Sequence, residues 1–163
     1  MTDAEATRWL DAGEREAWLG LAGVMLLLPS VLDSQLQRDA GLSTFEYLVL
    51  AMLSEAPART LQLKTLAALA NGSLSRLSHV VTRLEKRGWV RREPSVVDGR
   101  ITVAVLTDEG YAKVVASASS HVGTVREMVF DALTPAQVGQ LRDISRQIMR
   151  RLDPEGRYEP PTA

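Results

Sequence analysis

The sequence predicts a mainly α-helical chain that carries one small β-hairpin. Apolar residues recur at spacings of three and four along most of the 163 residues, which is the period of an amphipathic helix. The period changes to two only within residues 90–105, which favours two short strands joined by a turn. The length and the ordinary apolar content suit a single globular domain with an adequate core.

A long first helix is predicted over residues 14–39, after a polar segment, residues 1–12, that we expect to be loose. Proline removes a backbone donor, so we expect a kink at Pro29 and not a full break. Gly41 closes the helix. Its apolar face consists of Trp18, Leu21, Ala22, Met25, Leu28, Leu32 and Leu36.

A second helix is predicted to begin at Ser43 and to end before Pro57, with Glu46 completing a capping box. Residues 59–61 form an extended piece that could add a third strand to the hairpin. Residues 62–70 form a short helix whose leucines face inward.

A turn at Asn71–Gly72 leads into a further helix, which Ser73 caps and Gly88 closes. Its apolar stripe consists of Leu74, Leu77, Val80, Val81 and Leu84. The strands of the hairpin are predicted at 90–94 and 101–105. Helix, turn, helix and hairpin in this order form a winged helix-turn-helix.

Two more helices follow the hairpin. One is capped by Thr107 and extends to about residue 132, and the last begins at Thr134, with Gln137 completing a capping box, and extends to about residue 152. The prolines of residues 154–163 indicate a loose tail.

Positive charge is concentrated in the winged helix-turn-helix. Residues 73–101 contain seven Lys or Arg and three acids, a net charge of +4 (7 − 3), whereas the whole chain has a net charge of −1. Hydroxyl and basic side chains of the kind that bind phosphates and base edges dominate the polar face of the capped helix. These features predict binding to double-stranded DNA.

Several short segments match a known family: Leu66-Ala67, residues 84–90 (LEKRGWV), Asp98-Gly99-Arg100, and residues 106–110 (LTDEG). With the order of elements they resemble the MarR family of bacterial transcription regulators. The resemblance implies a homodimer on a pseudo-palindromic operator, with residues 13–42 and 107–153 forming the dimerisation region and 43–106 the DNA-binding lobe. It also implies a cytoplasmic repressor that a small organic effector releases.

By resemblance, the helix that Ser73 caps enters the major groove, Arg100 at the wing enters the minor groove, and Asp98 orients Arg100. The sequence departs from the family at His79 and Gly99, where arginines are frequent. It departs also at Ser95, where an aspartate is common. The predicted DNA-binding residues are Ser73, Ser75, Arg76, Ser78, His79, Thr82, Arg83, Lys86, Arg92, Asp98 and Arg100.

Other interpretations of single residues stay open. Trp18, Phe45 and Tyr47 either line an effector pocket or belong to the core. The winged helix could contact a protein instead of DNA, although such a surface needs no concentrated positive charge. Glu46 is interpreted as a cap residue and Glu55 as a surface residue. The sequence shows no catalytic nucleophile paired with a general base, so we do not expect an enzyme.

We expect no cofactor and no metal site, since the chain has no cysteine and only two histidines, His79 and His121. The lack of cysteine also excludes disulfides and a thiol redox switch. No membrane partner is expected, because the longest apolar run, around residues 26–28, is far shorter than the ~20 residues that span a bilayer.

Overall fold

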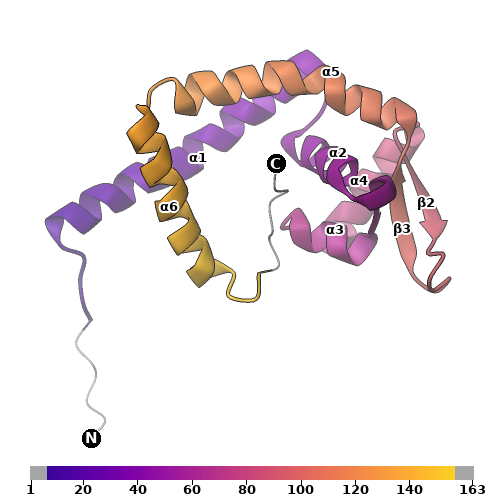
Figure 1. Ribbon diagram of the computed structural model, residues 1–163, viewed down its shortest axis with the longest axis horizontal. Coiled ribbons are helices and arrows are strands. Elements are labelled where there is room, and N and C mark those ends of the chain that lie inside the picture. The colour runs from indigo at the N-terminus through magenta and orange to yellow at the C-terminus, as the bar shows by residue number, and fades with distance from the viewer. Residues whose placement is uncertain (1–6, 157–163) are drawn as a thin grey trace, which may run out of the picture.

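The computed structural model describes residues 7–156 and confirms the mainly α-helical fold with its small sheet (Figure 1). The helices and strands are α1 (Ala12–Ala40), α2 (Thr44–Glu55), the 3₁₀ turn η1 (Pro57–Arg59), β1 (Thr60–Gln62), α3 (Leu63–Leu69), α4 (Leu74–Lys86), β2 (Val90–Pro94), β3 (Thr102–Leu106), α5 (Asp108–Val125), the π-helical turn η2 (Arg126–Phe130) and α6 (Pro135–Leu152).

Capping residues set most helix boundaries. Ser43 with Glu46 and Thr134 with Gln137 form the predicted capping boxes, and Asp11 forms a third with Glu14, so α1 begins at Ala12. The helix continues through Pro29 without a break and ends at Gly41, whose φ of 63° is left-handed. Residues 1–6 and 157–163, which include parts of the predicted loose ends, lie outside the described residues.

The winged-helix lobe (α2 to β3) holds most of the core. Leu50, Leu66, Leu77 and Leu84 are fully buried, and they join α2, α3 and α4 in one cluster that Leu36 of α1 completes. Leu74, predicted in the same stripe, is instead 53 % exposed. It is the first residue of α4, and that first turn extends beyond the core.

A three-stranded antiparallel sheet forms the wing, in the order β1-β3-β2. The predicted third strand is therefore present as β1. Strand β3 begins one residue later than predicted, because Ile101 belongs to the turn: its N–H donates to the Asp98 carbonyl and its carbonyl accepts from Ser95 N–H.

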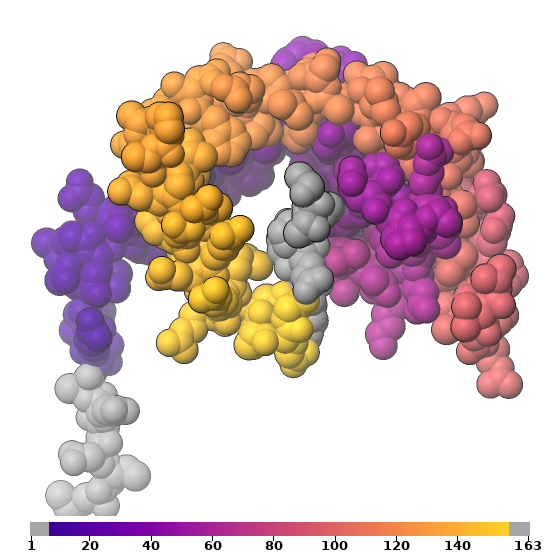
Figure 2. All heavy atoms as spheres, in the orientation of Figure 1, coloured from indigo at the N-terminus to yellow at the C-terminus, as the bar shows by residue number. Residues whose placement is uncertain are grey.

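Helices α1, α5 and α6 lie outside the winged-helix lobe. Helix α5 packs against α1 and α2, and α6 begins beyond the far end of α5 and runs back, so that its C-terminal end faces the α3–α4 turn across an open hollow (Figures 1 and 2). The predicted single helix up to residue 132 is interrupted by η2, where Asp131 N–H bonds the Arg126 carbonyl across five residues.

Much of the apolar surface on these helices is uncovered. Leu26 and Leu27 of α1 are exposed, and so are Leu141, Ile144, Ile148 and Leu152 along α6. Helix α1 is 29 residues long and contains an 18-residue stretch that is long and apolar enough to cross a membrane. The expectation that no segment has that length is therefore wrong, although length and composition alone do not assign α1 to a bilayer.

The joint between α1 and the lobe depends on one carboxylate. Asp33 of α1 accepts a hydrogen bond of 2.7 Å from the backbone N–H of Thr44, the first residue of α2. This bond to the backbone N–H outweighs partial burial and lowers the pKa of Asp33. The carboxylate thus satisfies a free donor at the positive end of α2.

We expect Asp33→Asn to lower the free energy of unfolding by about 0.5 kcal/mol at pH 7, because the amide oxygen can still accept from Thr44 N–H but the negative charge at the start of α2 is lost. A lowered pKa in the folded state contributes stability above the unfolded value, near 3.8, and that contribution is lost as the pH falls through the folded value. Urea unfolding at several pH values should therefore show the two proteins converging below about pH 3.8. An equal difference at pH 7 and pH 3 would contradict this, and Glu16→Gln, an exposed acid on the same helix, is the control.

Candidate nucleic-acid interface

Helix α4 presents a polar face to solvent and an apolar face to the core. Leu77, Val80, Val81 and Leu84 are buried, and the Ser73 hydroxyl accepts from Arg76 N–H as the predicted N-cap. Residues two positions from a buried residue lie on the opposite side of the helix, so their side chains point to solvent. Six predicted DNA-binding residues are exposed there: Ser75, Arg76, His79, Thr82, Arg83 and Lys86.

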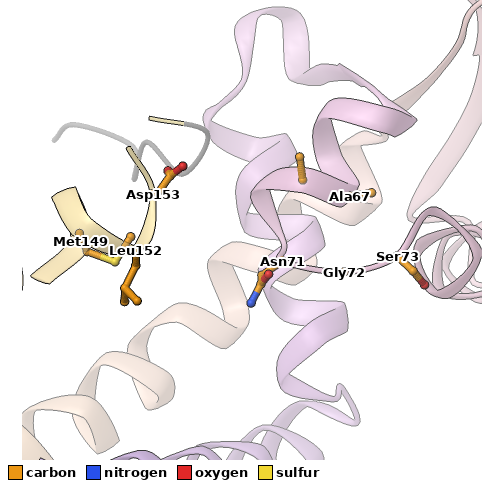
Figure 3. Close-up of a pocket in the computed structure, with 8 residues that line it drawn as sticks. Ala67, Asn71, Gly72, Ser73, Met149, Leu152 and Asp153 are labelled. Atoms are coloured by element: carbon orange, nitrogen blue, oxygen red, sulfur yellow. The ribbon is translucent and has the colours of Figure 1, made fainter. Parts of the chain in front are cut away.

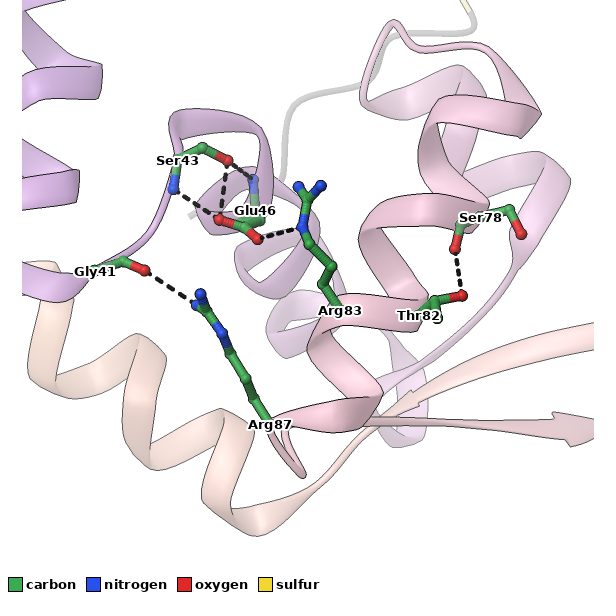
Figure 4. Close-up of polar contacts among 7 residues, drawn as sticks. All are labelled: Gly41, Ser43, Glu46, Ser78, Thr82, Arg83 and Arg87. Atoms are coloured by element: carbon green, nitrogen blue, oxygen red, sulfur yellow. Dashed lines mark hydrogen bonds and ion pairs between the residues drawn. The ribbon is translucent and has the colours of Figure 1, made fainter.

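Arg83 is tied to α2 through Glu46 (Figure 4). Its Nε donates to Glu46 Oε1 at 3.1 Å, while the other carboxylate oxygen accepts from the Ser43 N–H and hydroxyl. Burial raises the pKa of Glu46, but the bonds from Ser43 and Arg83 outweigh it and the net pKa is lowered. Glu46 is therefore an anion that holds both the start of α2 and the side chain of Arg83.

Arg76 and His79 border a shallow hollow between α2 and α4. The hollow has a volume of about 410 Å³ and is also lined by Ser43, Ser75 and Arg83. The guanidinium of Arg76 lies 4.2 Å from the centre of the Phe45 ring, a cation–π contact that keeps it against the lobe. The hollow is lined by two arginines, a histidine and hydroxyl side chains beside an apolar floor, and these donors suit a phosphate or a base edge.

Arg92 of β2 connects the wing to α4. Its guanidinium forms an ion pair with Glu85 and donates to the Ser78 carbonyl at 2.7 Å and to the Thr82 hydroxyl at 3.1 Å. The backbone N–H of Arg92 donates to Glu85 as well. Both terminal nitrogens of Arg92 are thus engaged inside the lobe, so its contact with DNA stays a prediction, whereas its bracing of the hairpin is directly visible.

The wing tip projects freely from the lobe. Asp98 Oδ1 accepts from the backbone N–H of Arg100 at 3.0 Å, so within the described residues it stabilises the turn and forms no ion pair with the Arg100 side chain. That guanidinium is exposed and available to a ligand. Val96 and Val97 at the tip are almost fully exposed.

Two residues that shape this surface were not predicted for it. The sequence predicts Glu46 only as a cap, and Glu85 is one of the three acids in the basic segment, residues 73–101. For Glu85 the sequence signal is a carboxylate within a strongly positive segment, which indicates pairing with an arginine. Glu46 has no such signal, because no basic residue lies between Arg38 and Arg59. Arg87 adds a further tie, since its Nη1 donates to the Gly41 carbonyl at 3.0 Å and fixes the end of α4 to the end of α1 (Figure 4).

The three aromatic residues proposed for an effector pocket do not meet within the chain. Phe45 and Tyr47 are buried in the core cluster, while Trp18 is 52 % exposed on α1. Trp18 lies 15 residues before Asp33, the α1 residue that contacts α2, which is about 22 Å along a helix. The three side chains therefore do not line one pocket within the described chain, and an effector pocket that includes them stays a prediction.

A different hollow, of about 800 Å³, lies between the α3–α4 turn and the end of α6 (Figure 3). Ala67, Asn71 and Gly72 form one side of it, and Met149 and Leu152 of α6 form the other. The hollow is open and mainly apolar, so it is part of the uncovered surface of α6 and not an enclosed ligand site.

The two histidines are not brought together. His79 is exposed on α4, whereas His121 of α5 bonds Gln35 of α1 at 3.2 Å and packs on Tyr47 with ring centres 4.6 Å apart. Burial lowers the pKa of His121. His121 therefore belongs to the packing of α5 on α1 and α2.

Comparisons with known proteins agree with this geometry. The MarR family model matches residues 42–102. The MarR family transcriptional regulator Sco3205 from Streptomyces coelicolor, solved in complex with DNA, is 44 % identical, and the match covers 96 % of this chain and 98 % of that one with a TM-score of 0.86. AbsC, a MarR family transcriptional regulator of the same organism, is 36 % identical, and the match covers 91 % of this chain and all of that one with a TM-score of 0.84.

A curated relative, the transcriptional repressor MprA of Escherichia coli, is 23 % identical over 120 residues, which are 74 % of this chain and 68 % of the relative. The identities to the two Streptomyces proteins extend over nearly the whole chain, and the family model covers the helix-turn-helix and most of the wing. This chain therefore belongs to the MarR family of winged helix-turn-helix transcriptional regulators.

Proposed function

We propose that the chain is a cytoplasmic repressor that binds a pseudo-palindromic operator as a homodimer and releases it when a small organic effector binds. The observation that carries the DNA-binding part is the exposed basic face of α4 with the wing braced beside it through Arg92. A relative with a DNA-bound structure and another named as a repressor support the proposal.

The uncovered apolar surface supports the homodimer. Helix α6 buries no residue in the described chain, yet four large apolar side chains form a stripe along it. Exposed stripes of this size mark an interaction surface. Helices α1, α5 and α6 of a second copy present the same kind of surface, and a two-fold interface buries one patch against itself.

The alternative is that the wing contacts a protein. The exposed apolar tip, Val96 and Val97, is the observation that favours it. Against it stands the arrangement of exposed basic side chains on α4, which a protein contact does not need.

The deciding experiment is selection of binding sites from random duplex DNA with the full chain. We expect a two-fold symmetric site whose half-site centres are about 34–36 Å apart, one turn of DNA. Enrichment of no sequence at low salt would reject the DNA-binding function and favour the protein-contact alternative.

Arg100→Ala tests the wing. A guanidinium gains from the negative potential of a narrow minor groove, so its loss should weaken operator binding and reduce the slope of log affinity against log salt by about 1 per protomer. Fluorescence anisotropy at several salt concentrations measures both. Arg15→Ala, which removes the same charge at the far end of α1, is the control. Unchanged affinity and slope in Arg100→Ala would show that the wing does not contact DNA.

A further inference from the structure

We propose that Glu46 is a positioning residue that orients Arg83 to recognise a guanine in the operator. The inference rests on the proposed DNA-binding function and assigns one step of sequence recognition to a buried carboxylate on a neighbouring helix. It starts from the way in which Glu46 divides its two oxygens between two partners (Figure 4).

The first oxygen is fixed by the helix cap. Glu46 Oε2 accepts from the Ser43 N–H at 2.9 Å and from its hydroxyl at 3.1 Å, and the residue is 5 % exposed. The carboxylate cannot rotate without losing these bonds, and burial makes an unpaired carboxylate costly. Its second oxygen, Oε1, therefore stands at a fixed place beside α4.

That second oxygen holds Arg83 by one donor only. The bond of 3.1 Å uses Nε, and the two terminal nitrogens point away from Glu46 in Figure 4. The Arg83 side chain is 56 % exposed, against 7 % for Glu46. A guanidinium has five donors, so four N–H groups remain on its two terminal nitrogens, and two of these lie along the outer edge, which can bind guanine O6 and N7 in a bidentate manner.

The other arginines of this surface are arranged differently. Arg76 lies over the Phe45 ring, and both terminal nitrogens of Arg92 are bonded within the lobe. Arg87 uses a terminal nitrogen on Gly41, not Nε. Arg83 alone, among the arginines within α4, combines a carboxylate on Nε with a free outer edge in the part of the chain that the structure describes.

A pair of this kind stabilises the fold little, because an exposed partner is well solvated. Its effect is to restrict the rotamers of Arg83 before DNA arrives, which lowers the entropy lost on binding. The restriction also favours the one base pair whose acceptors fit the fixed fork. Loss of Glu46 should therefore reduce discrimination at one position more than it reduces overall affinity.

Glu46→Gln separates this role from the cap. Glutamine also completes a capping box, so its oxygen can keep the Ser43 bonds, but its amide NH₂ then faces the N–H of Arg83 as donor against donor. One amide oxygen cannot serve both partners. Glu55→Gln is the matched control, since it removes the same charge from an exposed residue in the last turn of the same helix.

The measurement is the affinity of the full chain for the selected operator and for operators with a single base pair changed. We expect the wild type to reject one substituted G·C pair by about 10-fold or more, and Glu46→Gln to lose most of that factor while discrimination at other positions stays within about 2-fold. Arg83→Ala should lose the same factor, and adding Glu46→Gln to it should change nothing further. Glu55→Gln should keep the wild-type pattern.

Equal loss at every position in Glu46→Gln, or a further loss when it is added to Arg83→Ala, would show that Glu46 only supports the fold. Unchanged discrimination in Glu46→Gln would overturn the proposal outright. Failure of the wild type to select any operator is a distinct result, which would remove the proposed DNA-binding function and this inference with it.

Discussion

Gly110→Ala is expected to destabilise the chain by at least about 2 kcal/mol, the cost of forcing an extra methyl into packed structure. A Cβ at this position would lie 2.1 Å from the Trp89 carbonyl oxygen and 2.7 Å from the Leu106 side chain. The oxygen belongs to backbone that also accepts from Thr107 N–H, so it cannot move without loss of the α5 start. Thermal unfolding followed by circular dichroism would measure the effect.

Gly123→Ala provides the control within the same helix. Nothing lies within 4 Å of a Cβ there, and the residue is two positions from His121, which faces α1. Alanine should stabilise an exposed helix interior by up to about 1 kcal/mol. If Gly110→Ala were as stable as Gly123→Ala, the close approach of α5 to the Trp89 backbone would be contradicted.

Ile144→Asp is expected to convert the proposed dimer into monomer and to lower operator affinity by at least about 100-fold. Ile144 is 55 % exposed in the middle of the α6 stripe, and an aspartate there would be buried without a partner in a two-fold interface, twice per dimer. A monomer binds only a half-site and loses the gain from two linked contacts. Light scattering at micromolar concentration and anisotropy on the selected operator would report both effects.

Arg146→Gln changes the net charge by the same −1 on the opposite side of α6, two residues away, and should leave the dimer and the affinity intact. A dimer of wild-type strength in Ile144→Asp would mean that the α6 stripe is not the interface. Loss of the dimer in both variants would point to a general effect on α6 instead.

Local signals made the helix boundaries predictable. Helix caps act within four residues, so the residues around a cap determine where the helix begins or ends. Examples are the capping boxes at Ser43 and Thr134, the cap at Ser73 and the closing glycines. The period of two gave β2 with its observed bounds. The π-helical turn η2 was not predictable in the same way, because its residues, Met128 and Val129 among them, also fit an ordinary helix.

Contacts between residues that are far apart in the chain could not be predicted from the sequence. Glu46 and Arg83 are 37 residues apart, and Arg92 reaches Ser78 across 14. From the sequence, both arginines are only basic residues near a predicted DNA surface. Trp18 was grouped with Phe45 and Tyr47 for a similar reason: periodicity identifies an apolar face of a helix but not the surface that this face contacts. Leu74 has helical spacing, yet it lies beyond the end of the core.

The bracing by Arg92 has a consequence for operator spacing. Arg92 of the wing bonds three residues of α4, namely Glu85, Ser78 and Thr82, so the helix and the hairpin form one rigid DNA-binding unit. In the proposed dimer, the lobes can then differ in their separation but not in their internal arrangement. Two hydrogen bonds connect each lobe to α1, Thr44 N–H to Asp33 and Arg87 to the Gly41 carbonyl, and they control that separation. In the proposed dimer, a change in the distance between the two DNA-binding lobes would therefore be enough to release the operator, with every base-contacting side chain still in place.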